Sequence, residues 1–451
     1  MLKTCLAIFA FVCAIQTLSG ADASPWFVGA AKVDITPDYP VRLNGYGGRR
    51  TEVEGVEQRL FAKAIAFGRD TELPAVIVTV DNCGVPASIR DEVVRRLGAR
   101  TKVTSERFAV CSSHTHSAPM LVGVGITDFG AALFGADVPP EHWERIQRYT
   151  RDLTDWLEQV AVAALADRQP ATLAWGVGHV GFAHNRRAYA FRPEDHSLPV
   201  LRVTGADGKV RALLTSYACH CTTTGFNKFH ADWAGCAQEY LEQEFPGAIA
   251  LTAIGCGADQ NPNPRGTYEH AIEYGRALGA EAKRLAGGEM KPLAGRLECR
   301  SRLIQLPFRA VPTRAEWETK LADKSRTVAY HAKMQLAKLD RGMTLATEMP
   351  YLVQVWNFGA DLAMVFLAGE VVVDYAIRLK QELDAERLWV NSYANDVAAY
   401  IPSERVLQEG GYEGGGAMLY DDWPAAFAPG VEDRIVRTVH ELIPAEFKRP
   451  Q

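Results

Sequence analysis

The sequence lacks the charge pattern and the long apolar runs that mark nucleic-acid-binding and membrane-spanning proteins. It has 49 Lys and Arg residues against 54 Asp and Glu residues, which gives a formal net charge of −5. Without a basic block it offers no electrostatic footprint for a nucleic acid or an anionic membrane. Beyond the N-terminus, no apolar run approaches the roughly 20 residues that a membrane span requires. We therefore expect a small-molecule or lipid-like substrate, and the sequence does not indicate an oligomeric state.

Repeats, low-complexity tracts and Pro/Ser-rich linkers are also absent from the 451 residues. The composition, with 47% hydrophobic and 23% charged residues, is that of an ordinary globular protein. Length alone does not decide between one domain and two or three. Because no linker divides the chain, we expect a single large domain over residues 24–451.

The N-terminus has the three parts of a signal peptide. A basic start at Lys3 is followed by an apolar run from Leu6 to Ile15 and by small residues that end at Ala23. The apolar run is too short to span a bilayer, and the alternative is a buried N-terminal helix. We expect residues 1–23 to be removed and the mature protein to be secreted or periplasmic.

Cysteine is sparse and its spacing is not that of a disulfide scaffold. Of nine cysteines, seven follow the predicted signal peptide. An odd number in an oxidising compartment leaves at least one thiol free or paired between chains. The Cys219-His220-Cys221 segment has no C-x-x-C partner, which argues against a cysteine-ligated zinc site. We interpret the seven as mostly buried core residues: Cys83, Cys111, Cys219, Cys221, Cys236, Cys256 and Cys299.

Strand and helix patterns alternate along the chain. Strand-like runs at 75–80 and 108–111 flank a helical pattern at 89–97, and an amphipathic helix is predicted over 143–166. This order predicts an α/β fold, with a mixed sheet or sheets surrounded by helices. Further predictions are strands at 173–175, 201–203 and 212–217, a helix at 236–244, a charged helical segment at 313–339, and a hairpin of 351–356 with 362–366.

Two histidines follow the predicted strand at 108–111. His114 and His116 lie where a strand ends, which is the usual place of an α/β active site. On extended backbone, alternate residues face one side, so the two imidazoles would lie about 6 to 7 Å apart. The pair is a candidate metal motif, although such pairs also arise by chance on surfaces.

Another histidine and an acidic residue lie at predicted strand ends. His220 ends an apolar strand and is followed by the loop residues His230 and Asp232. Glu370 ends a strand and opens a predicted helix that runs through Leu379. It is either an anionic zinc ligand or a carboxylate that compensates the helix dipole.

A polar loop, 255–266, follows the apolar run 248–254 and contains Asp259, Asn261 and Arg265. Gly, Pro and Asx residues at a strand exit are typical of an active-site loop. They are equally typical of a turn in which Asx side chains cap backbone groups.

In combination these motifs resemble the neutral/alkaline (non-lysosomal) ceramidases. The resemblance runs from residues 28–37 and 44–47 through the H-T-H-S-x-P element to residues 412–414. It implies the catalytic domain of that family, an exported hydrolase of amide (N-acyl) bonds, sphingolipid substrates and one zinc ion per chain. The zinc ligands implied by the resemblance are His114, His220, Glu370 and Tyr400.

The resemblance also implies roles for neighbouring residues. Two imidazoles, a carboxylate and a phenol leave room for a water that zinc would activate. The residues expected to be catalytic are His116, Arg186, Asn261 and Asp259. Tyr412 is expected from the resemblance to lie near the substrate, and the polar residues of this chain that are also expected to contact it are His230, Asp232 and Arg265.

Two departures from the family pattern are visible. Asn261 stands where the family has its catalytic serine, and an amide can donate to an oxyanion but cannot be acylated. We also expect the chain to lack the immunoglobulin-like domain that usually follows in the family. Both departures indicate a divergent member.

Other functions remain open at this stage. The polar residues between 230 and 265 favour a zinc hydrolase of an ester or a carbohydrate derivative, because a lipid tunnel needs apolar lining. The missing serine is consistent with a non-catalytic binding protein. A cysteine hydrolase would use Cys256 with His220 or His230 as base. A second metal would call on Asp81 or Asp232.

Overall fold

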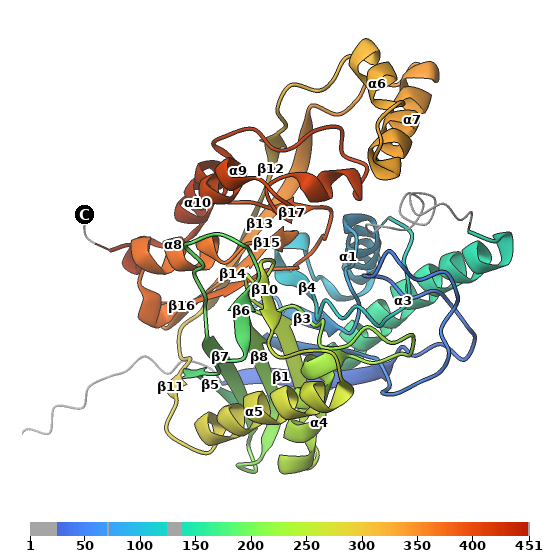
Figure 1. Cartoon of the computed structure of the whole chain (residues 1–451). Coiled ribbons are helices and arrows are strands. Elements are labelled where there is room, and N and C mark those ends of the chain that lie inside the picture. The colour runs from blue at the N-terminus through green and yellow to red at the C-terminus, as the bar shows by residue number, and fades with distance from the viewer. Residues whose placement is uncertain (1–24, 70–71, 124–137, 450–451) are drawn as a thin grey trace, which may run out of the picture.

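The computed structural model describes residues 25–69, 72–123 and 138–449. The predicted signal peptide, 1–23, lies outside the described residues. Within them the chain forms a mixed α/β fold in which two sheets pack together (Figure 1).

The larger sheet has the strand order β4-β3-β2-β1-β5-β7-β8-β9, with β11 beside β5. It is mixed, since β3 with β4 and β8 with β9 are parallel and the other pairs are antiparallel. Its strands are β1 (Trp26–Asp34), β2 (Phe61–Gly68), β3 (Ala75–Val80), β4 (Phe108–Ser112), β5 (Gln169–His179), β7 (Ser197–Gly205), β8 (Val210–Tyr217), β9 (Ile249–Ile254) and β11 (Lys291–Pro292).

Four helices cover this sheet. Each parallel pair is joined by a crossover helix, α1 (Ala87–Thr101) after β3 and α4 (Asp232–Glu244) after β8. α3 (Pro140–Ala166) lies against β1 and β2, and α5 (Tyr268–Ala286) lies beside α4 (Figure 1). The predicted strands at 75–80, 108–111 and 212–217 and the helices at 89–97 and 143–166 are thus confirmed.

The second sheet has the order β12-β13-β14-β16. Its β13–β14 hairpin turns at residues 359–361, as predicted. Its strands are β12 (Leu297–Pro307), β13 (Glu348–Phe358), β14 (Leu362–Leu367) and β16 (Leu388–Asn391), and its helices are α8 (Asp374–Glu382), α9 (Glu404–Glu409) and α10 (Val431–Leu442). The charged segment predicted at 313–339 forms two helices, α6 (Arg314–Lys320) and α7 (Arg326–Asp340), which project from this half of the molecule (Figure 1).

Alternation along the strands builds the core in layers. In β2 and β3, Ala64 and Val78 face α1 and α3, whereas Phe67 and Ile77 face the second sheet. There the Phe67 ring meets Trp356 edge to face at 5.9 Å. Burial of an aromatic side chain of this kind stabilises the fold by about 1.5–3 kcal/mol. The far side of the second sheet packs against α8 and α10.

The two parallel strand pairs end close together in space, although they stand at opposite ends of the strand order. β9 also lies against β2, β3 and β4. A parallel bridge joins Thr115, after β4, to Cys221, after β8, and His116 N donates to Cys221 O. This contact brings the two histidine segments together.

Two short sheets complete the region. β6 (Ala183–Asn185) pairs antiparallel with β10 (Gln260–Pro262), and β15 (Glu370–Val371) pairs parallel with β17 (Tyr400–Ile401). The prediction that Glu370 opens a helix is wrong, because α8 begins only at Asp374. Gly369, at φ +76°, turns the chain after β14 so that Glu370 enters β15 instead.

Among the described helices, none combines the length and the apolar character needed to cross a membrane.

Candidate metal centre

The His114 backbone departs from the extended conformation that the sequence predicted. Its φ is +55°, and its Nε2 lies 3.2 Å from His116 Nε2. The predicted separation of 6 to 7 Å is therefore wrong, because a left-handed residue turns the two rings toward each other. His116 also packs edge to face against the Tyr46 ring, with centroids 4.8 Å apart.

Two buried imidazoles are held by backbone carbonyls. His114 Nδ1 lies 2.5 Å from Cys83 O, and His220 Nδ1 lies 2.8 Å from Gly257 O. Each Nδ1–H donates to its carbonyl, which leaves the Nε2 lone pair of each ring facing inward. This is the usual arrangement behind metal-binding histidines.

Glu370 faces both free imidazole nitrogens. Its Oε2 lies 3.1 Å from His114 Nε2 and 3.3 Å from His220 Nε2. The same oxygen is buried without a well-directed hydrogen bond. One donor atom from each of the three residues lies within 4.8 Å of the others. The arrangement fits a divalent cation held by two nitrogens and one oxygen. Cys83, His114 and His116 form a second group of the same kind.

A phenol and a guanidinium border the cluster. Tyr400 OH lies 3.3 Å from His220 Nε2 and accepts from Arg186 Nη2 at 3.2 Å. Arg186 Nε donates to Glu413 at 2.8 Å, so its charge is balanced within the site. The Tyr400 hydroxyl is thus a fourth potential donor atom, and the second oxygen, at the edge of the cluster.

The charges in the cluster depend on burial. Burial and the charge of Arg186 lower the pKa of His220 to about 4, and burial lowers that of His116 well below its usual value. Burial also favours neutral His114, but the Glu370 carboxylate overrides it and raises the pKa of His114. Burial would raise the pKa of Glu370, yet His114 holds it well below its usual range. Protons and a metal ion thus compete for this donor set.

A small cavity, about 60 Å³ in volume, borders the cluster. Tyr412, a predicted substrate contact, lines it together with His114, His116 and Glu370. Sequence reasoning gave no role to Cys83, Tyr420 and Asp421, which also line it. Burial and the charge of Glu370 raise the pKa of Asp421 well above its usual value. No strand-end pattern marks Asp421, so nothing in the sequence indicated it.

Residues 26–126 match the family model described as neutral/alkaline non-lysosomal ceramidase, N-terminal. The resemblance to the neutral/alkaline ceramidases is confirmed. The chain is 21% identical to the neutral ceramidase of Pseudomonas aeruginosa over 98% of its own length and 76% of that protein's. It is 25% identical to the neutral ceramidase of Drosophila melanogaster over 59% of its length, and this match spans only 40% of the fly protein.

The crystal structure of the Pseudomonas aeruginosa neutral ceramidase has the same fold. It superposes with a TM-score of 0.73 over 95% of this chain and 76% of that one, at 19% identity. The predicted α/β architecture is therefore confirmed as ceramidase-like.

Asn261, which the sequence resemblance predicts to stand in place of a serine, lies in β10 beside Arg186. Its Oδ1 accepts from Arg186 Nη1 at 3.3 Å, and Thr222 Oγ1 is 3.5 Å away. Asp259, two residues earlier, is fully buried and is not among the residues that line the cavity. Its carboxylate accepts from Val373 N at 2.9 Å and from Asn185 Nδ2 at 2.8 Å. Asp259 thus joins β6 to the start of α8.

The structure does not place His230 or Asp232 in the cluster of His114, His220 and Glu370. His230 Nε2 lies 2.9 Å from Thr224 Oγ1, and Asp232 accepts from Thr223 N at 2.9 Å. Both are fully buried, and their hydrogen bonds organise the 222–224 loop. Arg265 is exposed and lines a separate polar cleft with Arg186 and Asn261.

The two remaining alternatives, a cysteine hydrolase and a second metal site, would both depend on buried side chains. Cys256 is fully buried, and burial raises its thiol pKa, which disfavours a nucleophile. All seven cysteines in the described residues are free, and six are buried. Asp81 accepts from Phe61 N at 2.9 Å and joins neither candidate metal group in the described part of the chain.

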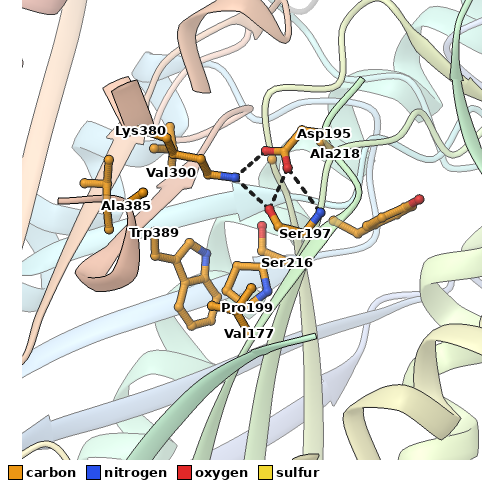
Figure 2. Close-up of a pocket in the computed structure, with 13 residues that line it drawn as sticks. Val177, Asp195, Ser197, Pro199, Ser216, Ala218, Lys380, Ala385, Trp389 and Val390 are labelled. Atoms are coloured by element: carbon orange, nitrogen blue, oxygen red, sulfur yellow. Dashed lines mark hydrogen bonds and ion pairs between the residues drawn. The ribbon is translucent and has the colours of Figure 1, made fainter. Parts of the chain in front are cut away.

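A second cavity, about 180 Å³ in volume, lies between the two sheets, away from the metal cluster. Figure 2 shows the Lys380 ammonium pointing at Asp195 and Ser197 above the Trp389 ring. Lys380 Nζ lies 2.6 Å from Asp195 Oδ2 and 2.7 Å from Ser197 Oγ, which donates to Asp195 Oδ1 at 2.6 Å. This ion pair ties α8 to the loop before β7.

We expect Lys380→Gln to lower the free energy of unfolding at pH 7 by about 2 kcal/mol, since it removes the cation that is paired with the partly buried Asp195 carboxylate. Burial would raise the pKa of Asp195, but Lys380 holds it below the usual 3.8. The pair therefore stabilises the protein above that pH, and its contribution is lost as the pH falls through the folded-state pKa. Urea denaturation at pH 7 and pH 3.5 measures the difference, which should shrink at the lower pH.

Lys291→Gln is the control for this prediction. Lys291 forms an exposed pair with Glu386 at 3.8 Å, so its loss should cost less than about 0.5 kcal/mol. Equal effects of the two variants would contradict a specific role for Lys380.

Proposed function

We propose that the chain is an exported zinc-dependent hydrolase that cleaves an amide (N-acyl) bond. The observation that carries the proposal is Glu370 Oε2, a buried carboxylate oxygen that lies 3.1 Å from His114 Nε2 and 3.3 Å from His220 Nε2. Two nitrogens, a carboxylate and a phenol suit zinc better than magnesium or calcium, which prefer oxygen.

The proposed ligands are His114, His220, Glu370 and Tyr400. A bound zinc ion supplies Lewis acidity and acidifies water to a pKa near 7. Tyr400 is protonated without a cation, because burial and Glu370 raise its pKa. The Arg186 guanidinium donates to Tyr400 OH and favours its ionised form.

The surrounding residues would bind and orient the substrate. Arg186 and Asn261 lie together, and both can donate hydrogen bonds toward a carbonyl oxygen that becomes negative. His116 is neutral and would contact the substrate's polar centre. Burial and the charge of Glu370 raise the pKa of Asp421, which suits this carboxyl group to donate a proton to a leaving amine.

A test begins with the metal content of the purified mature chain. We expect about one zinc per chain, hydrolysis of an N-acyl lipid, loss of turnover on chelation, and recovery when zinc is returned. A chain that binds no zinc and stays inactive after zinc is added would instead support a non-catalytic binding protein.

The second candidate is a zinc hydrolase of an ester or a carbohydrate derivative. It is favoured by the cleft beside Arg186, whose lining is mostly polar, including Asn261, Asn263 and Arg265. The same preparation separates the two candidates. Turnover of an ester or an N-acetyl sugar, with no fatty acid released from any N-acyl lipid, would replace the amide proposal.

A further inference from the structure

An open polar cleft lies beside the proposed metal centre. Its volume is about 650 Å³, roughly ten times the 60 Å³ of the small cavity at the histidines. β6, β10 and the loops that follow them form its walls. The side chains that matter for its chemistry are His184, Arg186, Arg192, Glu194, Asn261 and Arg265.

The cleft carries an excess of positive charge. Arg186 is balanced by Glu413, and Glu194 is shared by His184 and His196 at 3.2 and 3.4 Å. Arg192 and Arg265 are exposed on the cleft, and neither forms an ion pair with any described residue. Two unpaired guanidiniums in one cleft contrast with the net charge of −5 of the whole chain.

One side chain of the cleft wall, Arg186, links the cleft to the proposed metal centre by a hydrogen bond. Arg186 Nη2 donates to Tyr400 OH, and its Nη1 donates to Asn261 Oδ1 on the cleft wall. On the other side, the charge of Arg265 partly offsets the rise that burial causes in the pKa of Tyr46. The Tyr46 ring in turn packs against the His116 ring. A group bound in the cleft against Arg186 therefore lies one side chain away from Tyr400.

We infer that the cleft binds an oxyanion group of the substrate, namely a carboxylate, a sulfate or a phosphate, adjacent to the bond that is cleaved. This inference rests on the proposed function. The planar guanidiniums of Arg192 and Arg265 match the oxygen geometry of such groups, and the Asn261 amide adds a neutral donor. A long acyl chain would find little apolar surface here.

The first experiment uses inorganic sulfate and metal-free protein, so that zinc takes no part in binding. Isothermal titration should give a dissociation constant that rises about tenfold in the Arg192→Gln/Arg265→Gln double variant. Arg309→Gln, which removes an exposed arginine outside the cleft, is the matched control and should bind sulfate as the parent does. No sulfate binding by the parent, or equal binding by parent and double variant, would overturn the inference.

The second experiment uses the zinc-loaded enzyme and a pair of N-acyl amines that differ only in one phosphate group. The double variant should raise KM about tenfold for the phosphorylated member and leave KM for the neutral member nearly unchanged. An equal KM change for both members would overturn the inference. Sulfate binding that depends on the arginines, in a protein that hydrolyses neither compound, would leave the cleft assignment standing and reject the proposed hydrolase.

Discussion

His220→Ala should remove the bound zinc and lower turnover by about a thousandfold or more. His220 Nε2 is one of the two imidazole donors that face Glu370, and its loss leaves the carboxylate with a single nitrogen neighbour. Metal affinity falls steeply when one of few protein ligands is removed. Zinc content by mass spectrometry and turnover under saturating substrate would measure both effects.

Two variants make this result specific. His270→Ala removes a partly exposed histidine of α5, outside the cluster, and should retain both zinc and activity. Asp421→Asn should retain zinc but lose most of its turnover, because an amide cannot supply the proton. If His220→Ala keeps a full equivalent of zinc, the proposed ligand set is incorrect.

Gly369→Ala is expected to separate Glu370 from Tyr400 and to destabilise the fold by about 2–5 kcal/mol. Gly369 has φ +76°, and an added Cβ would lie 2.8 Å from Ala399 O and 2.7 Å from Ile401 Cγ1. Left-handed strain contributes roughly 1–2 kcal/mol and overpacking about 1–3 kcal/mol. Both contacts lie next to or within β17, the partner of β15, so the substitution should also reduce zinc affinity.

Gly342→Ala isolates the contact from the backbone strain. Gly342 has nearly the same φ, +75°, and its added Cβ would meet open space. Gly342→Ala should therefore lower the free energy of unfolding only by the backbone strain, and it should leave zinc binding intact. Thermal unfolding and zinc titration of both variants would test this, and equal zinc affinities would argue against the proposed role of the β15–β17 pairing.

Regular elements could be predicted from the sequence where their apolar pattern is continuous. The strand at 75–80 and the long helix at 143–166 follow directly from such patterns. The arrangement of the layers could not be predicted from the sequence. The alternation of side chains along a strand shows which residues share a face of the sheet, but it does not show which helix or sheet covers that face. The position of Glu370 was missed for a related reason, since the two-residue pairing of β15 with β17 leaves no periodic signal.

The histidine cluster was only partly accessible to sequence reasoning. The sequence pattern placed His114 and His116 at the end of a strand. It gave no sign of the left-handed φ of His114, which brings the Nε2 atoms of the two rings to 3.2 Å from each other. His230 and Asp232 had the right chemistry, yet their hydrogen-bonding capacity is met locally by threonines. A sequence shows which groups can bind a ligand and does not show which ones already have partners.

The distance along the chain between the proposed donors has a consequence for the order of events during synthesis. The proposed donors span almost 300 positions of the chain: His114, His220, Glu370 and Tyr400. The bridge from Thr115 to Cys221 joins only the segments that carry the two histidines. A chain emerging from the ribosome has no complete donor set until residue 400 has appeared. In zinc fingers the ligands are near neighbours and the ion drives folding. Here a cation that needs all four proposed donors would bind only after distant segments of the chain have come together.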